Sequence, residues 1–162
     1  MKDKKSILII IVLVILLGLS VAYIVFGPNG YKTTEKGKEF LDDVLELQSN
    51  LSYYVGASYS DAFGVYSKDE ILMGKTTEGE KIKDNQDNLL PTLVEEDSAQ
   101  DYGKDSKSYK LNMDNVKTTL KLKISDYEGV SFYVVEGDLV KVKFDGAEPD
   151  WWNNNYDGLI LK

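Results

Sequence analysis

The pattern of hydrophobic and polar residues begins with a long apolar run near the N-terminus. Residues 7–26 are 20 consecutive positions without a charge, Pro, Asn or Gln. A helix rises about 1.5 Å per residue, so this run spans roughly 30 Å, the thickness of the hydrocarbon core of a bilayer. Lipid offers no water to satisfy backbone N–H and C=O groups, which a helix pairs internally. We therefore predict a transmembrane helix over residues 7–26 that lies in the lipid bilayer.

Three lysines lie among the first five residues, directly before this run. Basic residues beside an N-terminal membrane helix stay in the cytoplasm, and a long domain behind the helix is translocated. We therefore expect a single-pass protein of the cell membrane with a cytoplasmic N-terminus. The predicted regions are a cytoplasmic tail at 1–6, the membrane helix at 7–26, a linker at 27–33 and an extracytoplasmic domain at 34–162.

Two other fates of the apolar run are open. A cleaved secretory signal ends in a small-x-small exit, which Ser20-Val21-Ala22 fits. The run continues to Phe26, however, so cleavage there would leave an apolar new N-terminus. Processing by a prepilin-type peptidase is the second possibility, and a permanent anchor is the interpretation that we adopt.

The same run contains a candidate contact between membrane helices. Gly18 and Ala22 are four residues apart and therefore share one helix face. Small residues at this spacing let two membrane helices approach closely, so this pair is the candidate contact.

Residues 34–63 have the hydrophobic periodicity of a long amphipathic helix. Acidic, lysine and amide side chains occupy much of the surface that the apolar residues leave, so one face is apolar. We expect this face to pack on a sheet of the same domain, with Gly56 and Gly64 as places where the helix bends or stops. The apolar residues recur at steps of three or four: Phe40, Leu41, Val44, Leu45, Leu47, Leu51, Tyr54 and Val55.

A second helix start follows shortly after. Ser67 is expected to cap the first turn, Glu70 to reach back to the cap, and Tyr66 to pack on Ile71. Gly74 then marks the C-terminal end, so this helix has barely two turns.

Polarity alone predicts the next three segments. Residues 75–88 are strongly charged and are expected to form a mobile loop. Residues 89–94 are a short apolar island that is expected to fix this loop to the core. Residues 95–108 are acidic and rich in turn formers, and we expect them to be exposed. The consecutive carboxylates of Glu95, Glu96 and Asp97 are accordingly interpreted as a solvated face rather than as paired catalytic acids.

The C-terminal half contains short strands and one brief helix. Asn112 is expected to cap a helix that ends at Leu120. Residues 139–144 alternate, with Val140, Val142 and Phe144 on an apolar face, and they form the clearest hairpin with the preceding strand. The predicted strands are 109–111, 130–135, 139–144 and 159–161. These elements predict an α+β fold, in which an N-terminal transmembrane helix precedes an amphipathic helix packed on a small antiparallel β-sheet.

Composition limits the chemistry, because the 162 residues include no His, Cys or Arg. The usual ligands of zinc, iron, copper and haem are therefore missing, as are Ser-His and Cys-His nucleophile pairs. Without Arg, there are no bidentate phosphate clamps. We expect no cofactor, no metal site and no enzyme activity, with a hydrolase that uses only carboxylates as a distant alternative.

Charge limits the partners. Beyond residue 5 the chain has 16 lysines against 26 acidic residues. Affinity for nucleic acid comes largely from neutralising phosphates, so we expect no nucleic-acid partner. The same excess of carboxylates is repelled by anionic lipid headgroups.

The most unusual local composition lies near the C-terminus, where two tryptophans adjoin a run of asparagines. Aromatic rings of this kind can stack on sugar rings while amides and carboxylates bind hydroxyl groups, which is the chemistry of glycan recognition. Alternatively, one Trp covers the core and the asparagines form turns. We expect one ring to be buried against the apolar face of 139–144 and the other to be exposed. The candidate ligand-binding residues are Trp151, Trp152, Asn153, Asn155, Tyr156 and Asp157.

The order of these elements resembles that of bacterial type IV pilins and pseudopilins. The segment that runs from residues 109–111 through residues 130–144 is similar to the C-terminal parts of pilin-like proteins from low-GC Gram-positive bacteria. The resemblance implies assembly with other envelope or pilus-like proteins. The sequence departs from that family at residues 5–8, where pilins carry a Gly and then a segment with Glu, and at residues 27–30, which interrupt the helix.

We therefore expect a membrane-anchored extracytoplasmic protein that acts by binding or assembly. A pilin-like or pseudopilin-like subunit is its most specific form. The alternative is a cell-envelope sensor or glycan-binding module that uses the Trp151–Trp152 loop.

Overall fold

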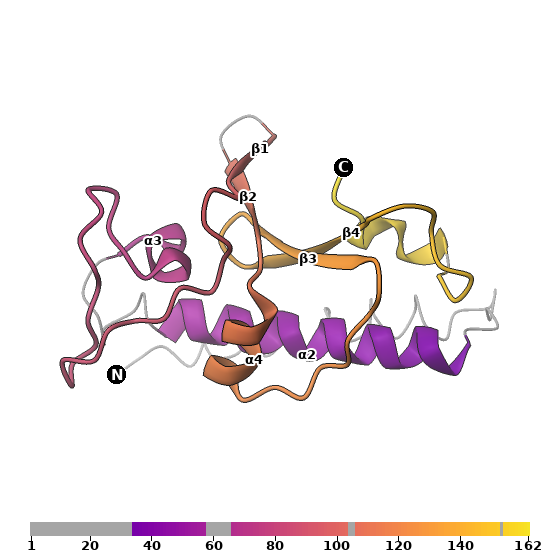
Figure 1. Cartoon of the computed structure of the whole chain (residues 1–162), viewed down its shortest axis with the longest axis horizontal. Helices are drawn as coiled ribbons and strands as arrows, with labels where there is room; N and C mark the ends of the chain where they lie inside the picture. The colour runs from indigo at the N-terminus through magenta and orange to yellow at the C-terminus, as the bar shows by residue number, and fades with distance from the viewer. Residues whose placement is uncertain (1–33, 58–65, 104–105, 153) are drawn as a thin grey trace, which may run out of the picture. The chain divides into compact units, whose positions relative to one another are not determined.

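The structure is a computed structural model that describes residues 34–57, 66–103, 106–152 and 154–162 (Figure 1). The chain divides into two compact units, Met1–Thr34 and Glu35–Lys162, and the described elements belong to the second. The predicted tail, membrane helix and linker, with Gly18 and Ala22, lie outside the described residues. Within the described part, no helix is both long enough and apolar enough to cross a membrane.

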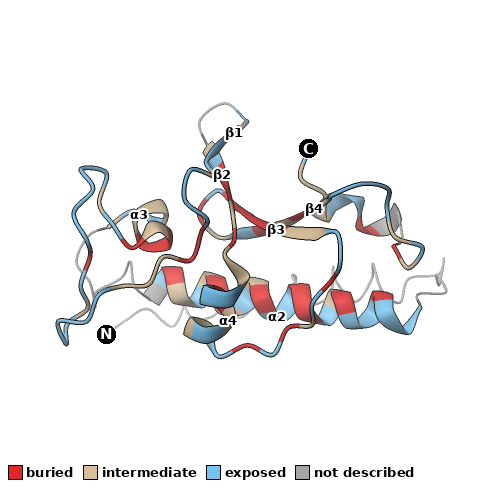
Figure 2. Cartoon of the chain, viewed as in Figure 1, coloured by how far each residue is buried: buried red, intermediate tan, exposed pale blue. Residues whose placement is uncertain are grey.

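The longest element is helix α2, Glu35–Ala57, which confirms the amphipathic helix over most of its predicted length. Its buried residues recur along one side and appear as separate red bands in Figure 2. Leu45 was predicted on this stripe but lies at its edge and is 40% exposed. Residues 58–63 of the predicted helix lie outside the described part of the chain. The buried stripe consists of Phe40, Val44, Leu47, Leu51 and Val55.

The sheet consists of four antiparallel strands in the order β1-β2-β3-β4. The strands are β1 (Gln100–Tyr102), β2 (Ser106–Lys110), β3 (Val130–Val135) and β4 (Leu139–Phe144). In β4, Val140 and Val142 are buried while Leu139 and Lys143 are exposed, as the alternation predicts. Phe132 of β3 pairs with Val142, and both join the core on which α2 packs. The predicted α+β arrangement of an amphipathic helix on a small antiparallel sheet is therefore confirmed.

Helix α3, Lys68–Met73, begins and ends where the sequence predicts. The Ser67 hydroxyl accepts a hydrogen bond from the Glu70 N–H at 3.3 Å, and the Glu70 carboxylate accepts one from the Ser67 N–H at 2.8 Å. Gly74 ends the helix in the left-handed region, with φ +63°. A Cβ atom at this position would meet the carbonyl oxygen of Leu90 at 2.7 Å, so only glycine fits.

Helix α4, Met113–Leu120, follows β2 and contacts α2. Asn112 caps it, because its side chain accepts a hydrogen bond from the Asn115 N–H at 3.1 Å. Val116 faces the core and is fully buried. The predicted cap and the predicted end of this helix are both confirmed.

The segment before this helix is mostly exposed, as predicted, but it contains strands that were not predicted. Residues 95–108 hold β1 and the first part of β2, and the side chain of Ser108 is buried. The cause is pairing with a distant strand, since Ser108 lies opposite Val135 in β3. Local polarity carries no information about such a register.

The C-terminus also differs from the expected last strand. The first residue of the predicted strand 159–161 is instead the last residue of the 3-10 helix η2, Asn154–Leu159, and the other two residues follow this helix. A single parallel bridge joins Val142 to Ile160, and the Leu161 N–H donates to the carbonyl of Val142 at 2.8 Å. The C-terminal segment therefore touches the outer edge of β4 without extending the sheet as a full strand.

Candidate functional site

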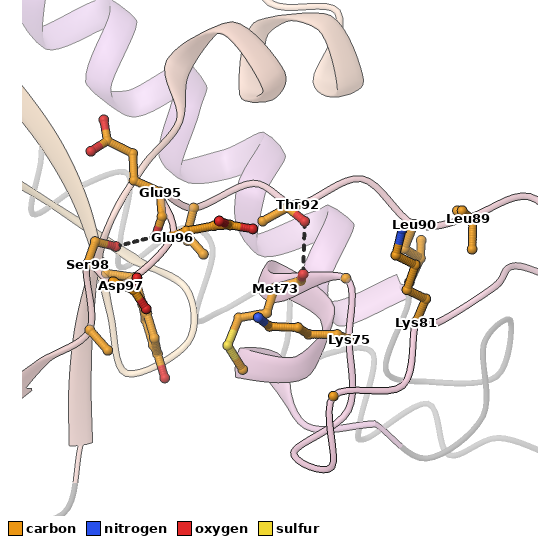
Figure 3. Close-up of a pocket in the computed structure, with 15 residues that line it drawn as sticks. Met73, Lys75, Lys81, Leu89, Leu90, Thr92, Glu95, Glu96, Asp97 and Ser98 are labelled. Carbon is orange, nitrogen blue, oxygen red and sulfur yellow. Dashed lines mark hydrogen bonds between the residues drawn. The ribbon is translucent and has the colours of Figure 1, made fainter.

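A cleft lies between the loops that follow α3 and the turn that precedes β1 (Figure 3). Its volume is about 450 Å³, which is within the range of small-molecule binding sites. One wall carries Lys75 and Lys81, and the opposite wall carries Glu95, Glu96 and Asp97. We call this feature the charged cleft.

Backbone pairing closes the loop that builds the lysine wall. An antiparallel bridge joins Lys75 to Lys81, and the next residue, Ile82, is buried. The Ile82 N–H donates to the carbonyl of Gly74 at 3.0 Å, and the Leu90 N–H donates to the carbonyl of Ile82 at 2.9 Å. The polar segment that was predicted as a mobile loop is therefore held by main-chain hydrogen bonds at the level of the cleft.

A short strap, residues 92–93, connects the two walls along the chain and is bonded to the rest of the domain. The Leu93 N–H donates to the carbonyl of Leu72 at 2.8 Å, and the Leu93 carbonyl accepts from the Asn112 N–H at 2.9 Å. The Thr92 hydroxyl donates to the carbonyl of Met73 at 3.0 Å (Figure 3). The strap is therefore bonded both to the end of α3 and to the start of α4.

Apolar side chains also line the charged cleft. Met73 and Leu90 are partly buried, Val94 is buried, and Leu89 is 53% exposed. The predicted apolar island at 89–94 is thus confirmed as an attachment to the core in its second half. Its first residue instead presents an apolar surface to solvent.

A tight turn carries the acidic wall. The Ser98 hydroxyl donates to the carbonyl of Glu95 at 2.7 Å and accepts from the Lys110 N–H at 3.1 Å. The Lys110 amine pairs with the Glu95 carboxylate at 3.1 Å, and this bond raises the pKa of Lys110. Asp97 takes a positive φ of 56°, which reverses the chain within the turn. The turn is therefore fixed to β2 on one side.

The remaining charges of the charged cleft have no partner of opposite sign. Across the described residues, no ion pair involves Lys75, Lys81, Glu96 or Asp97, although all four line the same space. In Figure 3, Lys75 and Glu96 extend toward this space from opposite sides. The cleft therefore presents both signs of charge, separated across its width.

The hydroxyl of Tyr109 also belongs to the lining, and its state bears on catalysis. It donates a hydrogen bond to the Asp69 carboxylate at 3.0 Å. Burial and then the negative charge of Asp69 raise the pKa of Tyr109 to about 12. At neutral pH the hydroxyl is protonated and already bonded, so it is not placed to act as a base. The charged cleft has the chemistry of a binding site.

The second candidate is the Trp151–Trp152 loop, in which Trp152 belongs to the core. Its side chain is 9% exposed, and its ring lies 4.9 Å from the Phe144 ring and 5.6 Å from the Tyr156 ring, edge to face. The indole N–H is buried and finds no hydrogen-bond partner in the described part of the chain. The expected burial of one tryptophan against the 139–144 strand is confirmed.

Trp151 is partly buried rather than exposed. Its ring lies 4.9 Å from the Phe40 ring and 5.7 Å from the Tyr127 ring. The amine of Lys36 is 5.8 Å from the ring centroid, the distance of a cation–π contact. A sugar would therefore meet only the remaining exposed part of this ring.

The other residues predicted to bind a ligand are spread around η2. Tyr156 is buried in the aromatic core, and Asp157 is exposed. Asn153 lies outside the described residues, and of Asn155 only the backbone, within η2, is described. In the described ranges, no three residues of the His, Cys, Asp or Glu type come close enough to hold a metal ion. Glycan binding by this loop stays a prediction.

Comparison with known protein families, curated proteins and solved structures found no match for this chain.

The charged cleft was not foreseen as a unit from the sequence. Lys75 and Glu96 lie in segments that were interpreted as separate solvated loops. The sequence did contain one indication of the cleft. The capped short helix ends at Gly74, and the apolar island at 89–94 has to pack on the core, so the loop between them should return to the end of α3. Which charges then face each other depends on hydrogen bonds between distant residues, such as that from Leu93 to Leu72.

Proposed function

We propose that this chain is a single-pass, membrane-anchored protein whose domain 34–162 lies outside the cytoplasm and acts by binding or assembly. The proposal assigns no catalytic role to the domain. In its most specific form, the protein is a pilin-like or pseudopilin-like subunit.

The observation that carries the proposal is the run of 20 residues without a charge at 7–26, directly after three lysines. The 20-residue apolar run belongs to the first unit, and the α+β domain is the second. A charge-free run of this length, with three lysines directly before it, supports a membrane anchor that is followed by a folded extracytoplasmic part.

The packing of α2 on an antiparallel sheet supports the pilin-like form. The resemblance implies a long helix that follows the anchor and lies along a small sheet, and α2 has this arrangement with β3 and β4. The departures at residues 5–8 and 27–30 concern processing and the path of the helix between the anchor and α2. They do not affect the layout of the domain itself.

Cysteine labelling tests the proposed location, because the natural chain has no Cys. Ser49→Cys places a thiol on the exposed side of α2, and Asp3→Cys places one before the apolar run without removing a lysine. A maleimide that does not cross membranes should label the Ser49→Cys variant in intact cells. It should label the Asp3→Cys variant only after the cells are made permeable.

Two results would contradict the proposal. One is labelling of Asp3→Cys, but not Ser49→Cys, in intact cells, which would reverse the orientation. The other is recovery of both variants in the soluble cytoplasmic fraction, which would exclude the anchor.

A further inference from the structure

We infer that the charged cleft binds a short peptide that carries both a free amino terminus and a free carboxylate. The inference deepens the proposed binding role of the domain and rests on it. The peptide carboxylate would meet Lys75 and Lys81, and the peptide amine would meet Glu96 and Asp97. The chemistry of the two walls carries this assignment.

The arrangement of charge favours a zwitterion over a ligand of one sign. An anion beside Lys75 would also face the carboxylates of Glu96 and Asp97, and a cation beside those carboxylates would face the lysines. No ion pair crosses the cleft within the described residues, so neither wall neutralises the other. A ligand with one charge at each end satisfies both walls together.

The rigidity of the walls also favours binding. The lysine wall is closed by the Lys75–Lys81 bridge, and the acidic wall is fixed by Ser98 and Lys110. The strap between the walls is bonded to α3 and to Asn112. A ligand therefore orders little of the main chain when it binds, and the entropic cost falls on the exposed side chains of Lys75, Lys81, Glu96 and Asp97.

Size and lining indicate a peptide of a few residues. A volume of about 450 Å³ lies toward the lower part of the range for small-molecule sites and does not admit a folded partner. Apolar side chains of Met73, Leu90 and Val94 also line the cleft, and Leu89 exposes apolar surface there, beside Leu90 and Lys81 in Figure 3. These residues would contact the side chains of the bound peptide while the walls hold its ends.

The methionines provide a direct reporter of this site. The chain has three, Met1, Met73 and Met113, and of the two that the structure describes, Met73 alone lines the charged cleft. In the full-length chain, labelled with ¹³C at the methionine methyl groups and held in detergent, trialanine with free ends should shift the Met73 signal. The signals of Met1 and Met113 should not move. Met73→Leu identifies the responding signal by its loss.

Blocked peptides and charge variants test the recognition of both ends. N-acetyl-trialanine and trialanine amide each lack one charge, so each should bind at least about tenfold more weakly than trialanine. Lys75→Gln and Glu96→Gln should each lower the affinity for trialanine by a similar factor. The matched controls Lys123→Gln and Glu128→Gln remove exposed charges outside the cleft and should leave the affinity unchanged.

Three results would overturn the inference. They are no movement of the Met73 signal at the highest soluble concentration of trialanine, equal binding of free and blocked peptides, and equal affinity of the cleft variants and their controls. Cysteine labelling in cells does not involve a peptide, so a failure of the ligand assignment is distinguishable from a failure of the proposed location.

Discussion

The carboxylate of Asp43 is a buried charge in the middle of helix α2, and two donors satisfy it. The Tyr127 hydroxyl donates to its Oδ2 atom at 2.8 Å, and the Ser125 N–H donates to the same atom at 2.9 Å. Burial, followed by the hydrogen bond and the charge of Asp43, raises the pKa of Tyr127, so its hydroxyl remains a donor at neutral pH. A buried carboxylate needs such donors because desolvation alone is costly.

Replacing Tyr127 by Phe should therefore destabilise the domain more than the loss of one exposed hydroxyl would. Asp43 would keep only the Ser125 donor, and an underpaired buried acceptor costs about 1–3 kcal/mol. Urea unfolding of the variant measures this difference. Tyr53→Phe is the control, because Tyr53 is 78% exposed. This substitution should change the free energy of unfolding by no more than about 0.5 kcal/mol. Equal stability of the two variants would show that the Asp43 bond contributes nothing.

Glu70 predicts a dependence of stability on pH. Backbone hydrogen bonds from Ser67 and then Thr77 lower its pKa from the ordinary value of 4.5. A carboxyl with a lowered pKa in the folded state stabilises the fold above its unfolded pKa, and this stabilisation is lost as pH falls through the folded pKa. Glu70→Ala should therefore be less stable than the natural chain at pH 7, with a difference that shrinks below pH 4.5. Thermal unfolding across this range measures it, and a difference independent of pH would contradict the assignment.

Gln48 links two elements, because its side chain on α2 bonds to the β3–β4 hairpin. Its Nε2 atom donates to the carbonyl of Asp138 at 2.6 Å, and its Oε1 atom accepts from the Val140 N–H at 2.7 Å. The amide side chain thus continues the main-chain pairing at the end of the hairpin where β4 starts. The other contacts between α2 and the sheet are largely apolar, so these two directional hydrogen bonds help to fix the orientation of the helix on the sheet.

Replacing Gln48 by Leu should cost about 1–3 kcal/mol, because it leaves the Val140 N–H and the Asp138 carbonyl without this partner. Asn50→Ala is the matched control, since the Asn50 amide bonds only within α2, to Glu46. The difference between the variants can be measured by urea unfolding. A Gln48 variant as stable as the Asn50 variant would show that apolar packing alone orients the helix.

Elements with a strong local signal were predictable from the sequence, whereas their long-range pairing was not. The stripe from Phe40 to Val55, the Ser67–Glu70 capping box and the alternation in β4 depend on residues close in sequence. The position of β1 depends on its register with β2. The position of the charged cleft depends on the hydrogen bond from the Leu93 N–H to the carbonyl of Leu72. Local polarity predicted that these residues are exposed, but it could not predict the strand or the cleft because it does not report distant partners.

At the scale of the whole domain, an aromatic cluster joins the first turns of α2 to the C-terminal loop. The Phe40 ring contacts the rings of Tyr127, Trp151 and Trp152, although these residues lie more than 80 positions further along the chain. The sequence indicated that one tryptophan would be buried but not that both would contact the same helix residue. The loop that was considered for glycan recognition is therefore also part of what closes the fold.

Trp152→Ala should destabilise the domain by about 3–5 kcal/mol, because it removes a buried ring. Trp152→Phe keeps an aromatic ring and removes the unpartnered indole N–H, so it should cost less. Trp151→Ala should lie between the natural chain and Trp152→Ala, since Trp151 is only partly buried. Melting temperatures of the three variants test this order, and a normal melting temperature for Trp152→Ala would contradict the burial.

The proposed permanent membrane anchor can be tested most directly on the mature protein. Peptide mapping by mass spectrometry of the chain extracted from membranes reports whether the apolar run is retained. We predict that peptides covering residues 7–26 are present and that the domain is released from membranes by detergent but not by alkaline carbonate. A mature chain that begins near Ser6 would indicate prepilin-type processing, and one that begins at Tyr23 would indicate secretion. Either result would contradict an uncleaved anchor.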